Sequence, residues 1–237
     1  MQKNHVRERV LVTGGGSGIG AAIAQACRDL GRDVVVLDRA GGTITVDLSD
    51  AADTARALSR ALEDGPITRL VNNVGMVCPA SIEEQTLTEF DLAYALNLRC
   101  AFQCLQALLP GMKAARFGRV VNISSRAALG KELRTAYAAS KAGLIGASRV
   151  WALELGRHGI TVNAVGPGPI RTPLFEAANP TDAPRTRAIV EAIPVRRMGE
   201  PEDVAHTVEY LLDARSGFVT GQTIYVCGGM TTGLAPA

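Results

Sequence analysis

VLVTGGGSGIG, residues Val10–Gly20, is the most informative stretch of this sequence. Its first four residues, Val10–Thr13, have the apolar pattern of a buried strand, and an apolar helical pattern, Ile19–Leu30, follows the glycines. Glycines allow a tight turn in which backbone N–H groups approach a pyrophosphate, and the N-terminal end of a helix favours that negative charge. A glycine-rich turn also occurs for conformational reasons alone, but the flanking strand and helix predict a dinucleotide-binding site here.

The next strand pattern ends in Asp38, which bears on the choice of cofactor. An acidic residue about 20 positions beyond the glycine loop accepts a hydrogen bond from the ribose 2′-hydroxyl of NAD and repels the 2′-phosphate of NADP. Arg39 keeps NADP open as the alternative, because a guanidinium binds phosphate. Since Ser17 in the loop supplies no second positive charge, we expect NAD.

Outside this segment, short apolar runs alternate with segments of helical length, which predicts one domain, residues 1–237, built on a doubly wound parallel sheet. Such a sheet binds ligands at the carboxyl ends of its strands. The expected strands are Val10–Thr13, Val34–Asp38, Thr43–Asp47, Leu70–Asn72, Arg119–Ser124, Thr161–Val165 and Thr223–Val226. The expected helices are Ile19–Leu30, Ala51–Leu62, Glu89–Leu109, Tyr137–Leu155 and Pro201–Leu212.

Two connections depart from this regularity. Only four residues separate Asp38 from Thr43, too few for a helical crossover, so we expect a helix-free and nearly extended link. The Pro-, Gly- and Arg-rich stretch Pro167–Pro201 is irregular, and its position beside the ligand edge predicts a lid over about residues 173–197. Passive surface packing is the alternative for this stretch.

Composition excludes several functional classes. The formal net charge of +2, without a long block of like charges, argues against a nucleic-acid partner. No apolar stretch approaches the roughly 20 residues that span a bilayer, and the N-terminus lacks a signal-peptide core. Five scattered cysteines and three histidines do not have metal-ligand spacing. These features predict a cytoplasmic protein with reduced thiols, no metal and no membrane association.

Further motifs follow the glycine loop in order, and with them the chain resembles the short-chain dehydrogenase/reductase family over essentially its whole length. The matching residues are Thr13, Gly14, Gly18 and Gly20; Asn72-Asn73-Val74-Gly75; Asn97; Asn122-Ile123-Ser124-Ser125; Tyr137 and Lys141 in Tyr-x3-Lys; and Pro167-Gly168. The resemblance implies a Rossmann-type, three-layer α/β/α fold. Within the family, Arg197–Ala205 and Gly221–Thr223 look most like the 3-oxoacyl-acyl-carrier-protein reductases. Two departures count against that exact activity: those enzymes mostly prefer NADP, and they usually have a helix where this chain has its short link.

The resemblance also assigns roles. Tyr137 is the expected general acid and base, and Lys141 lowers its pKa and holds the nicotinamide ribose, while Asn97 supports a water relay. A serine stabilises the oxyanion: counting back from Tyr137 selects Ser124, whereas alignment from the strand selects Ser125, which we prefer because a loop tolerates a deletion better than a strand tolerates a register slip. The predicted cofactor-binding residues are Gly14, Ser17, Gly18, Ile19, Gly20, Asp38, Arg39, Asp47, Leu48, Asn73, Val74, Gly75, Tyr137, Lys141, Pro167, Gly168, Ile170 and Thr172.

The sequence thus predicts an NAD-dependent oxidoreductase that moves a hydride between nicotinamide and a small-molecule secondary alcohol or ketone. The alternatives are an NADP-dependent 3-oxoacyl-carrier-protein or coenzyme-A-linked ketone reductase, and a non-catalytic dinucleotide-binding regulatory protein. Arg126, Lys131 and Arg134 make one loop near the expected site basic, which suits an anionic substrate group or simply a solvated loop. The helices Glu89–Leu109 and Tyr137–Leu155 are apolar on most sides, and the resemblance implies that they pack between subunits of a homotetramer, or at least of a dimer.

Overall fold

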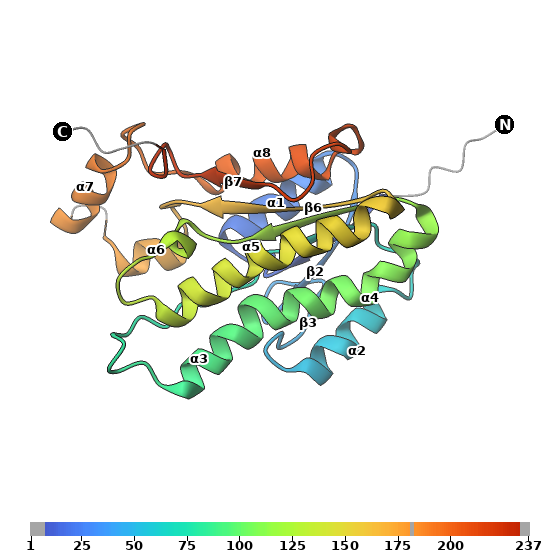
Figure 1. Cartoon of the computed structure of the whole chain (residues 1–237), viewed down its shortest axis with the longest axis horizontal. Helices are drawn as coiled ribbons and strands as arrows, with labels where there is room; N and C mark the ends of the chain where they lie inside the picture. Colours follow the sequence, from blue (N-terminus) through green and yellow to red (C-terminus); the bar gives the residue numbers. More distant parts are fainter. Residues whose placement is uncertain (1–7, 181–182, 233–237) are drawn as a thin grey trace.

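The computed structural model describes residues 8–180 and 183–232, which form a Rossmann-like single domain with helices on both faces of one parallel sheet (Figure 1). The sheet has seven strands in the order β3-β2-β1-β4-β5-β6-β7. The direction of strand addition reverses between β1 and β4, the place where such sheets bind ligands. The strands are β1 Arg9–Thr13, β2 Asp33–Asp38, β3 Ile44–Thr45, β4 Arg69–Asn72, β5 Gly118–Ile123, β6 Ile160–Pro167 and β7 Thr223–Val226.

Two apolar cores hold the helices against the sheet. Helices α1 and α8 pack on one face, over Val10, Val12 and their neighbours, and α2, α4 and α5 cover the other face, over Leu11 and Leu70. Because both faces are covered, the strands are continuous apolar runs without alternation. The main helices are α1 Gly18–Asp29, α2 Ala51–Ala61, α3 Leu87–Tyr94, α4 Cys100–Ala115, α5 Thr135–Leu155 and α8 Pro201–Leu212.

The short link after β2 is helix-free, as expected, but it is not extended. Residues 39–43 form successive bends that bring the chain back along β2, so that the Thr43 hydroxyl accepts a hydrogen bond from the Val36 N–H at 3.1 Å. The chain then runs forward as β3, which pairs in parallel with β2 through Leu37 and Ile44. Since the bends use part of the predicted strand Thr43–Asp47, only Ile44–Thr45 remain as strand.

The predicted helix Glu89–Leu109 is three consecutive segments. Between α3 and α4 lies a π-helical turn, Ala95–Arg99, which contains Asn97, and α4 continues through Pro110 to Ala115. A π turn inserts one residue into a helix and changes the spacing of its apolar residues only slightly. The sequence pattern therefore predicts one continuous helix. Such turns occur frequently at functional sites.

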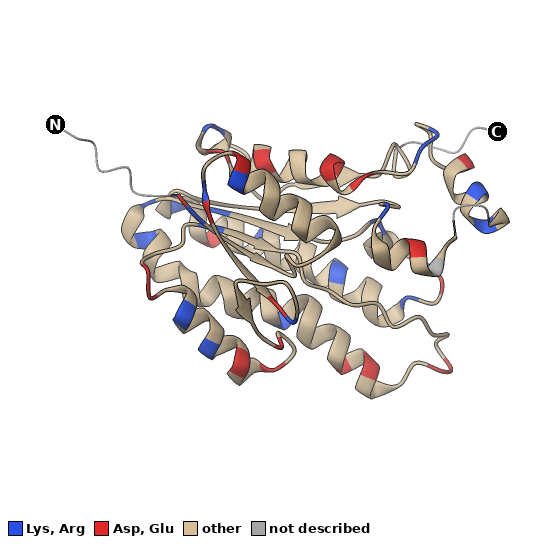
Figure 2. Ribbon diagram, turned by 180° about the vertical axis from the view of Figure 1, so that it is seen from behind, with Lys and Arg blue, Asp and Glu red and all other residues tan. Residues whose placement is uncertain are grey.

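The predicted lid region is more regular than its composition suggests. It contains two short helices, α6 Pro173–Ala178 and α7 Pro184–Glu191, each with proline in its first turn. Both lie at the end of the molecule toward which β6 points (Figure 1). Figure 2 shows basic residues on α7 at this end and a second group of them at the opposite end, where the chain begins. No described helix is long and apolar enough to cross a membrane.

Candidate active site

The glycine loop and the start of α1 form a cradle that fits a pyrophosphate. Ser17 is the N-cap residue, but no side chain caps α1, and its first turn contains no acidic residue. The helix end therefore keeps its positive partial charge for a ligand. A Cβ at Gly20 would lie 2.0 Å from the Gly14 carbonyl oxygen, so this close turn requires glycine. The loop lines a cavity of about 340 Å³.

The loop is held in place from the neighbouring strand. The Thr13 hydroxyl accepts hydrogen bonds from the backbone N–H groups of Asn73 (3.0 Å) and Val74 (3.2 Å). In return the Asn73 side-chain amide donates to the carbonyls of Thr13 (3.1 Å) and Gly14 (2.8 Å). These four bonds join β1 to β4 at the switch point, so the Asn73 side chain fixes the cradle's shape.

Asp38 closes the cradle at the end of β2. Its carboxylate accepts hydrogen bonds from the backbone N–H groups of Gly16 (2.8 Å) and Ala40 (3.2 Å), and both Asp38 and Arg39 line the cavity. Asp47 and Leu48 line it from the other side, and hydrogen bonds from Ser49 hold the pKa of Asp47 below its ordinary value. The cavity therefore offers both a carboxylate and a guanidinium where a ribose is expected.

A second cavity, of about 740 Å³, adjoins the first and shares Ile19, Asn73, Gly75, Thr172 and Leu174 with it. The pair has the two-part form that a dinucleotide requires. Every predicted cofactor residue lines one or both cavities. Those that face the larger one are Ile19, Asn73, Gly75, Tyr137, Lys141, Pro167, Gly168, Ile170 and Thr172.

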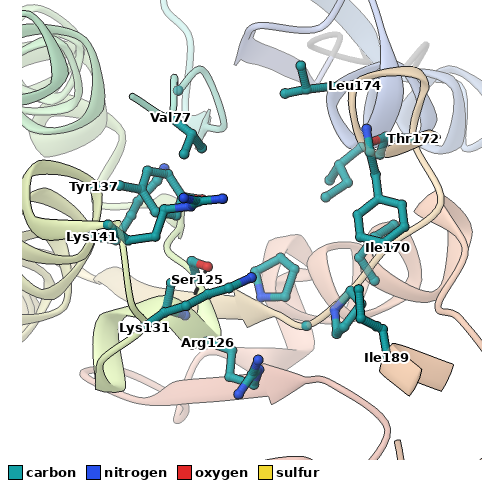
Figure 3. Close-up of a pocket in the computed structure, with 18 of the residues that line it drawn as sticks. Val77, Ser125, Arg126, Lys131, Tyr137, Lys141, Ile170, Thr172, Leu174 and Ile189 are labelled. Carbon is teal, nitrogen blue, oxygen red and sulfur yellow. Dashed lines mark hydrogen bonds between the residues drawn. The ribbon is translucent and has the colours of Figure 1, made fainter. Parts of the chain in front are cut away.

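Tyr137, Lys141 and Ser125 lie on one wall of the larger cavity, and the lid and the Ile170 segment form the opposite wall (Figure 3). Tyr137 and Lys141 are four residues apart on α5 and therefore share a face of the helix. The Lys141 Nζ atom lies 5.9 Å from the centre of the Tyr137 ring and donates a 2.7 Å hydrogen bond to the Ile123 carbonyl. A Cβ at Gly75 would lie 3.1 Å from this Nζ, so glycine there lets the ammonium reach the cavity.

Burial dominates the acid–base properties of this wall. It lowers the pKa of Lys141 to about 8. Burial also raises the pKa of Tyr137 above its ordinary value, and a hydrogen bond with Ser125 and the charge of Arg134 only partly offset the rise. The pKa of Tyr137 is therefore raised, not lowered as expected, because desolvation of the phenolate is the largest effect.

The two candidate serines have different surroundings. Ser124 is 2% exposed, and its hydroxyl donates to the Lys141 carbonyl at 2.8 Å, which ties β5 to α5. Ser125 is half-buried, accepts a hydrogen bond from the Ala127 N–H at 3.1 Å and interacts with Tyr137. This division favours Ser125 as the residue that faces a substrate.

Asn97 does not line either cavity. Its side chain accepts from the Met76 N–H (2.8 Å) and donates to the Met76 carbonyl (3.1 Å) and the Ser140 hydroxyl (2.9 Å). The π turn thus aims Asn97 at the segment after Gly75 and at α5. In this structure its amide joins the Met76 segment to α5.

The structure also brings residues to the cavity that the sequence did not single out: Val77, Leu174, Phe175, Ile189 and Arg185. Val77 follows a recognised motif, but the others belong to the lid, whose fold no local pattern predicts. No group of three or more potential metal ligands is found in residues 8–180 and 183–232.

A parallel sheet with a phosphate cradle and an adjoining substrate-sized cavity defines the class of nucleotide-dependent α/β oxidoreductases. A protein-family model described as enoyl-(acyl carrier protein) reductase matches residues 14–231 of this chain. The chain belongs to the short-chain dehydrogenase/reductase family. The relatives that match it are oxidoreductases that act on hydroxyl or keto groups with NAD(P).

Individual relatives resemble the chain over nearly its full length. It is 35% identical over 243 residues to the (2S)-[(R)-hydroxy(phenyl)methyl]succinyl-CoA dehydrogenase subunit BbsD of Thauera aromatica, covering 94% of this chain and 97% of that one. It is 34% identical to the 3-oxoacyl-[acyl-carrier-protein] reductase FabG of Rickettsia conorii, covering 93% and 95%. A solved structure named as an NAD(P)-dependent gluconate 5-dehydrogenase from Beutenbergia cavernae, with NADP bound at low occupancy, has a TM-score of 0.88 and 32% identity, covering 95% and 97%.

Proposed function

We propose that this chain is an NAD-dependent oxidoreductase that interconverts a secondary alcohol and a ketone, with Tyr137 as general acid and base and Ser125, Lys141 and Asn97 in support. The observation that carries the proposal is the position of Tyr137 beside Ser125, in a cavity that adjoins the phosphate cradle. The bound nicotinamide would supply or accept the hydride.

The chain's own residues divide the remaining work. Tyr137 gives a proton to the carbonyl oxygen during reduction and takes it back during oxidation. Ser125 donates a hydrogen bond to the same oxygen, where negative charge develops. Lys141, held by the Ile123 carbonyl, places a positive charge beside the tyrosine. Asn97 fixes the separation between the Met76 segment and α5.

Asp38 supports NAD over NADP. Its carboxylate lies at the edge of the cradle, where it would accept from a ribose hydroxyl and repel a 2′-phosphate. NADP-dependent reduction of a carrier-protein or coenzyme-A-linked ketone is the second candidate. It is favoured by Arg39 in the same cavity, by the relatives named as 3-oxoacyl reductases and by the NADP in the solved relative.

Titration with NADH and NADPH, followed through energy transfer from Trp151 and the tyrosines, tests the cofactor. At least tenfold tighter binding of NADH, about 1.4 kcal/mol, supports NAD, and the reverse supports the second candidate. Turnover of a panel of secondary alcohols and ketones, read at 340 nm, tests catalysis. A chain that binds neither dinucleotide and turns over no ketone in the panel would contradict the proposal and restore the non-catalytic alternative.

We also propose a homotetramer built through α4 and α5. Phe102 on α4 and Val150 and Leu153 on α5 are 49%, 51% and 85% exposed, an unusual amount of apolar surface for two long helices. Light scattering at micromolar concentration measures the mass, and a Leu153→Glu variant should dissociate. A monomeric wild-type chain would refute this assembly.

A further inference from the structure

Four cations line the larger cavity in addition to Lys141. Arg126, Lys131 and Arg134 come from the segment between β5 and α5, and Arg185 comes from α7 of the lid. Figure 3 shows Arg126 and Lys131 on the same side of the cavity as Ser125. No aspartate or glutamate is present among the described residues that line the cavity. We call these four residues the cationic rim.

In the described part of the chain, no ion pair neutralises the positive charge of the rim. Within residues 8–180 and 183–232, none of the four cations forms an ion pair, whereas Arg171 and Arg197 nearby pair with Glu200 and Asp203. The only hydrogen bond found for a rim side chain in that part of the molecule is from Arg134 to the Leu133 carbonyl. The rim donors are thus available to a ligand.

The three arginines of the rim are close enough to act on Lys131. Burial lowers the pKa of Lys131, and the charges of Arg134, Arg126 and Arg185 lower it further. Mutual repulsion of this kind is relieved by an anion bound among the cations.

Much of the remaining lining is apolar, which limits the form of the ligand. Val77, Ile170, Leu174, Phe175 and Ile189 line the cavity beside the polar groups of the proposed catalytic site. A sugar-like polyol would leave several of its hydroxyl groups against these side chains without partners, which is unfavourable. A short carbon chain that ends in an anionic group would satisfy both surfaces.

We propose that the substrate of this site carries an anionic group, a carboxylate or phosphate, which the cationic rim binds while an apolar segment between that group and the reacting carbon contacts Val77, Ile170 and Leu174. The inference rests on the proposed function, because it takes the carbon beside Tyr137 as the reacting one. Charge selects the substrate at the rim, and the apolar wall sets the distance between the anion and the hydroxyl or keto group.

Matched substrate pairs test the inference and distinguish the two sources of negative charge. The first pair is a 3-oxo acid and its methyl ester, which differ in the carboxylate. The second is a 3-oxoacyl-CoA and the corresponding N-acetylcysteamine thioester, which differ in the phosphates. We expect at least a tenfold higher kcat/KM for the anionic member of one pair. Equal or better turnover of both neutral members would overturn the inference and leave the proposed function intact.

Rim variants show whether the selectivity comes from these residues. Lys131→Gln and Arg185→Gln should each reduce the anionic-to-neutral ratio of kcat/KM about three- to tenfold, mainly through a higher KM for the anionic member. Lys113→Gln on α4 makes the same change in net charge away from the cavity and serves as the control. A ratio that the two rim variants leave unchanged would also overturn the inference.

A binding measurement keeps the inference testable if no ketone in the panel reacts. Isothermal titration with acetoacetate and with acetyl-CoA needs no turnover, so it separates failure of the proposed function from failure of the rim. Binding of either probe that weakens at least tenfold in the Lys131→Gln/Arg185→Gln double variant supports the rim. Absence of binding to the wild-type chain, or binding that the double variant retains, overturns it.

Discussion

The two ends of the sheet both hold arginines, but they use them differently. At the amino end, Arg9, Arg69 and Arg119 lie on neighbouring strands and are 7%, 3% and 4% exposed. At the carboxyl end, the cationic rim lines the larger cavity. The two sets have the same sign of charge, so composition alone does not distinguish them.

Their partners distinguish them. Arg9 pairs with Asp33 at 3.0 Å and donates to the Ala61 and Gly65 carbonyls. Arg119 donates to the carbonyls of Gly118, Gly159, Asp213 and Ala214, and its guanidinium lies 4.4 Å from the centre of the Phe117 ring.

Arg69 pairs with Glu8 at 2.8 Å, donates to the Leu212 carbonyl and lies on the same phenylalanine ring. The amino-end arginines are therefore satisfied by the protein itself. In the described part of the chain the rim cations find no comparable partners. A cation with satisfied donors stabilises the fold, and one with free donors beside a cavity is available for a ligand.

The largest expected effect lies at the carboxyl end and falls on activity alone. Tyr137→Phe removes the proposed proton donor and should lower kcat about 10²- to 10⁴-fold. Urea unfolding should shift by less than about 1 kcal/mol, because the ring still packs. Tyr210→Phe, at a tyrosine that is 52% exposed on α8, is the matched control and should change neither value. Retention of full activity in Tyr137→Phe would refute the proposed role.

The next largest effect is expected at the amino end of the sheet, where a substitution should reduce the free energy of unfolding and leave activity nearly unchanged. Arg119→Met removes the donor to one buried and three partly buried carbonyls and should reduce the free energy of unfolding by about 3 kcal/mol. The kcat of the folded protein should remain within about twofold of the wild type. Arg56→Met, at an arginine that is 70% exposed and pairs with Asp53 on α2, should cost less than about 0.5 kcal/mol. Similar losses of unfolding free energy in the two variants would contradict the structural role of Arg119.

The same contrast explains what the sequence does and does not predict. Strands such as β1 and β5 are predictable because burial on both faces requires continuous apolar runs, and the cradle is predictable because glycine has few alternatives there. The partners of Arg119 are not, since the carbonyls of Asp213 and Ala214 are 94 and 95 residues away along the chain. Local patterns carry no information about such contacts.

The site shows the same division. Tyr137 and Lys141 share a helix, so their spacing predicts a common face. Arg185 reaches the rim only because the lid folds into two helices, and the Pro-rich sequence of the lid does not encode where they pack. The π turn at Asn97 escapes prediction because one inserted residue barely changes the periodicity of the flanking helices.

Proton loss at Lys141 predicts how reduction depends on pH. Its pKa is about 8, and that of Tyr137 is raised, so the phenol stays protonated while the ammonium is lost above pH 8. The kcat/KM for ketone reduction should therefore be flat below pH 8 and fall about tenfold by pH 9. A profile that rises from pH 7 to pH 9 would contradict the proposed role of the ammonium.

Stability should change in the opposite direction over the same range, which provides the control. An unfolded lysine has its ordinary pKa near 10.5, so between pH 8 and 10.5 the unfolded chain binds more protons than the folded one at this residue. The contribution of Lys141 to the free energy of unfolding therefore increases with pH. Urea unfolding at pH 8 and pH 9 measures it, and lost activity that accompanies lost stability would mean that unfolding, not the ammonium, causes the decline.

The smallest expected effect is a change in cofactor preference. It tests whether Arg39, like the rim cations, is available to bind an anionic ligand. Like the rim cations, Arg39 lines a cavity and has no ion pair in the described residues, but the carboxylate of Asp38 lies beside it. Asp38→Ser removes the repulsion that a 2′-phosphate would meet and should shift the ratio of NADH to NADPH affinity about tenfold toward NADPH, roughly 1.4 kcal/mol. Asp91→Ser on the exposed side of α3 should leave the ratio unchanged.

A wild-type chain that already prefers NADPH would place Arg39 in the same group as the rim cations. Arg39 would then behave as the rim cations do and bind an anion despite the adjacent carboxylate. The two backbone N–H groups that donate to Asp38 would explain how, because they draw the carboxylate's charge toward Gly16 and Ala40 and away from the ribose position. In that case free donors beside a cavity would outweigh a neighbouring charge, and Asp38→Ser would lower loop stability without changing the cofactor ratio.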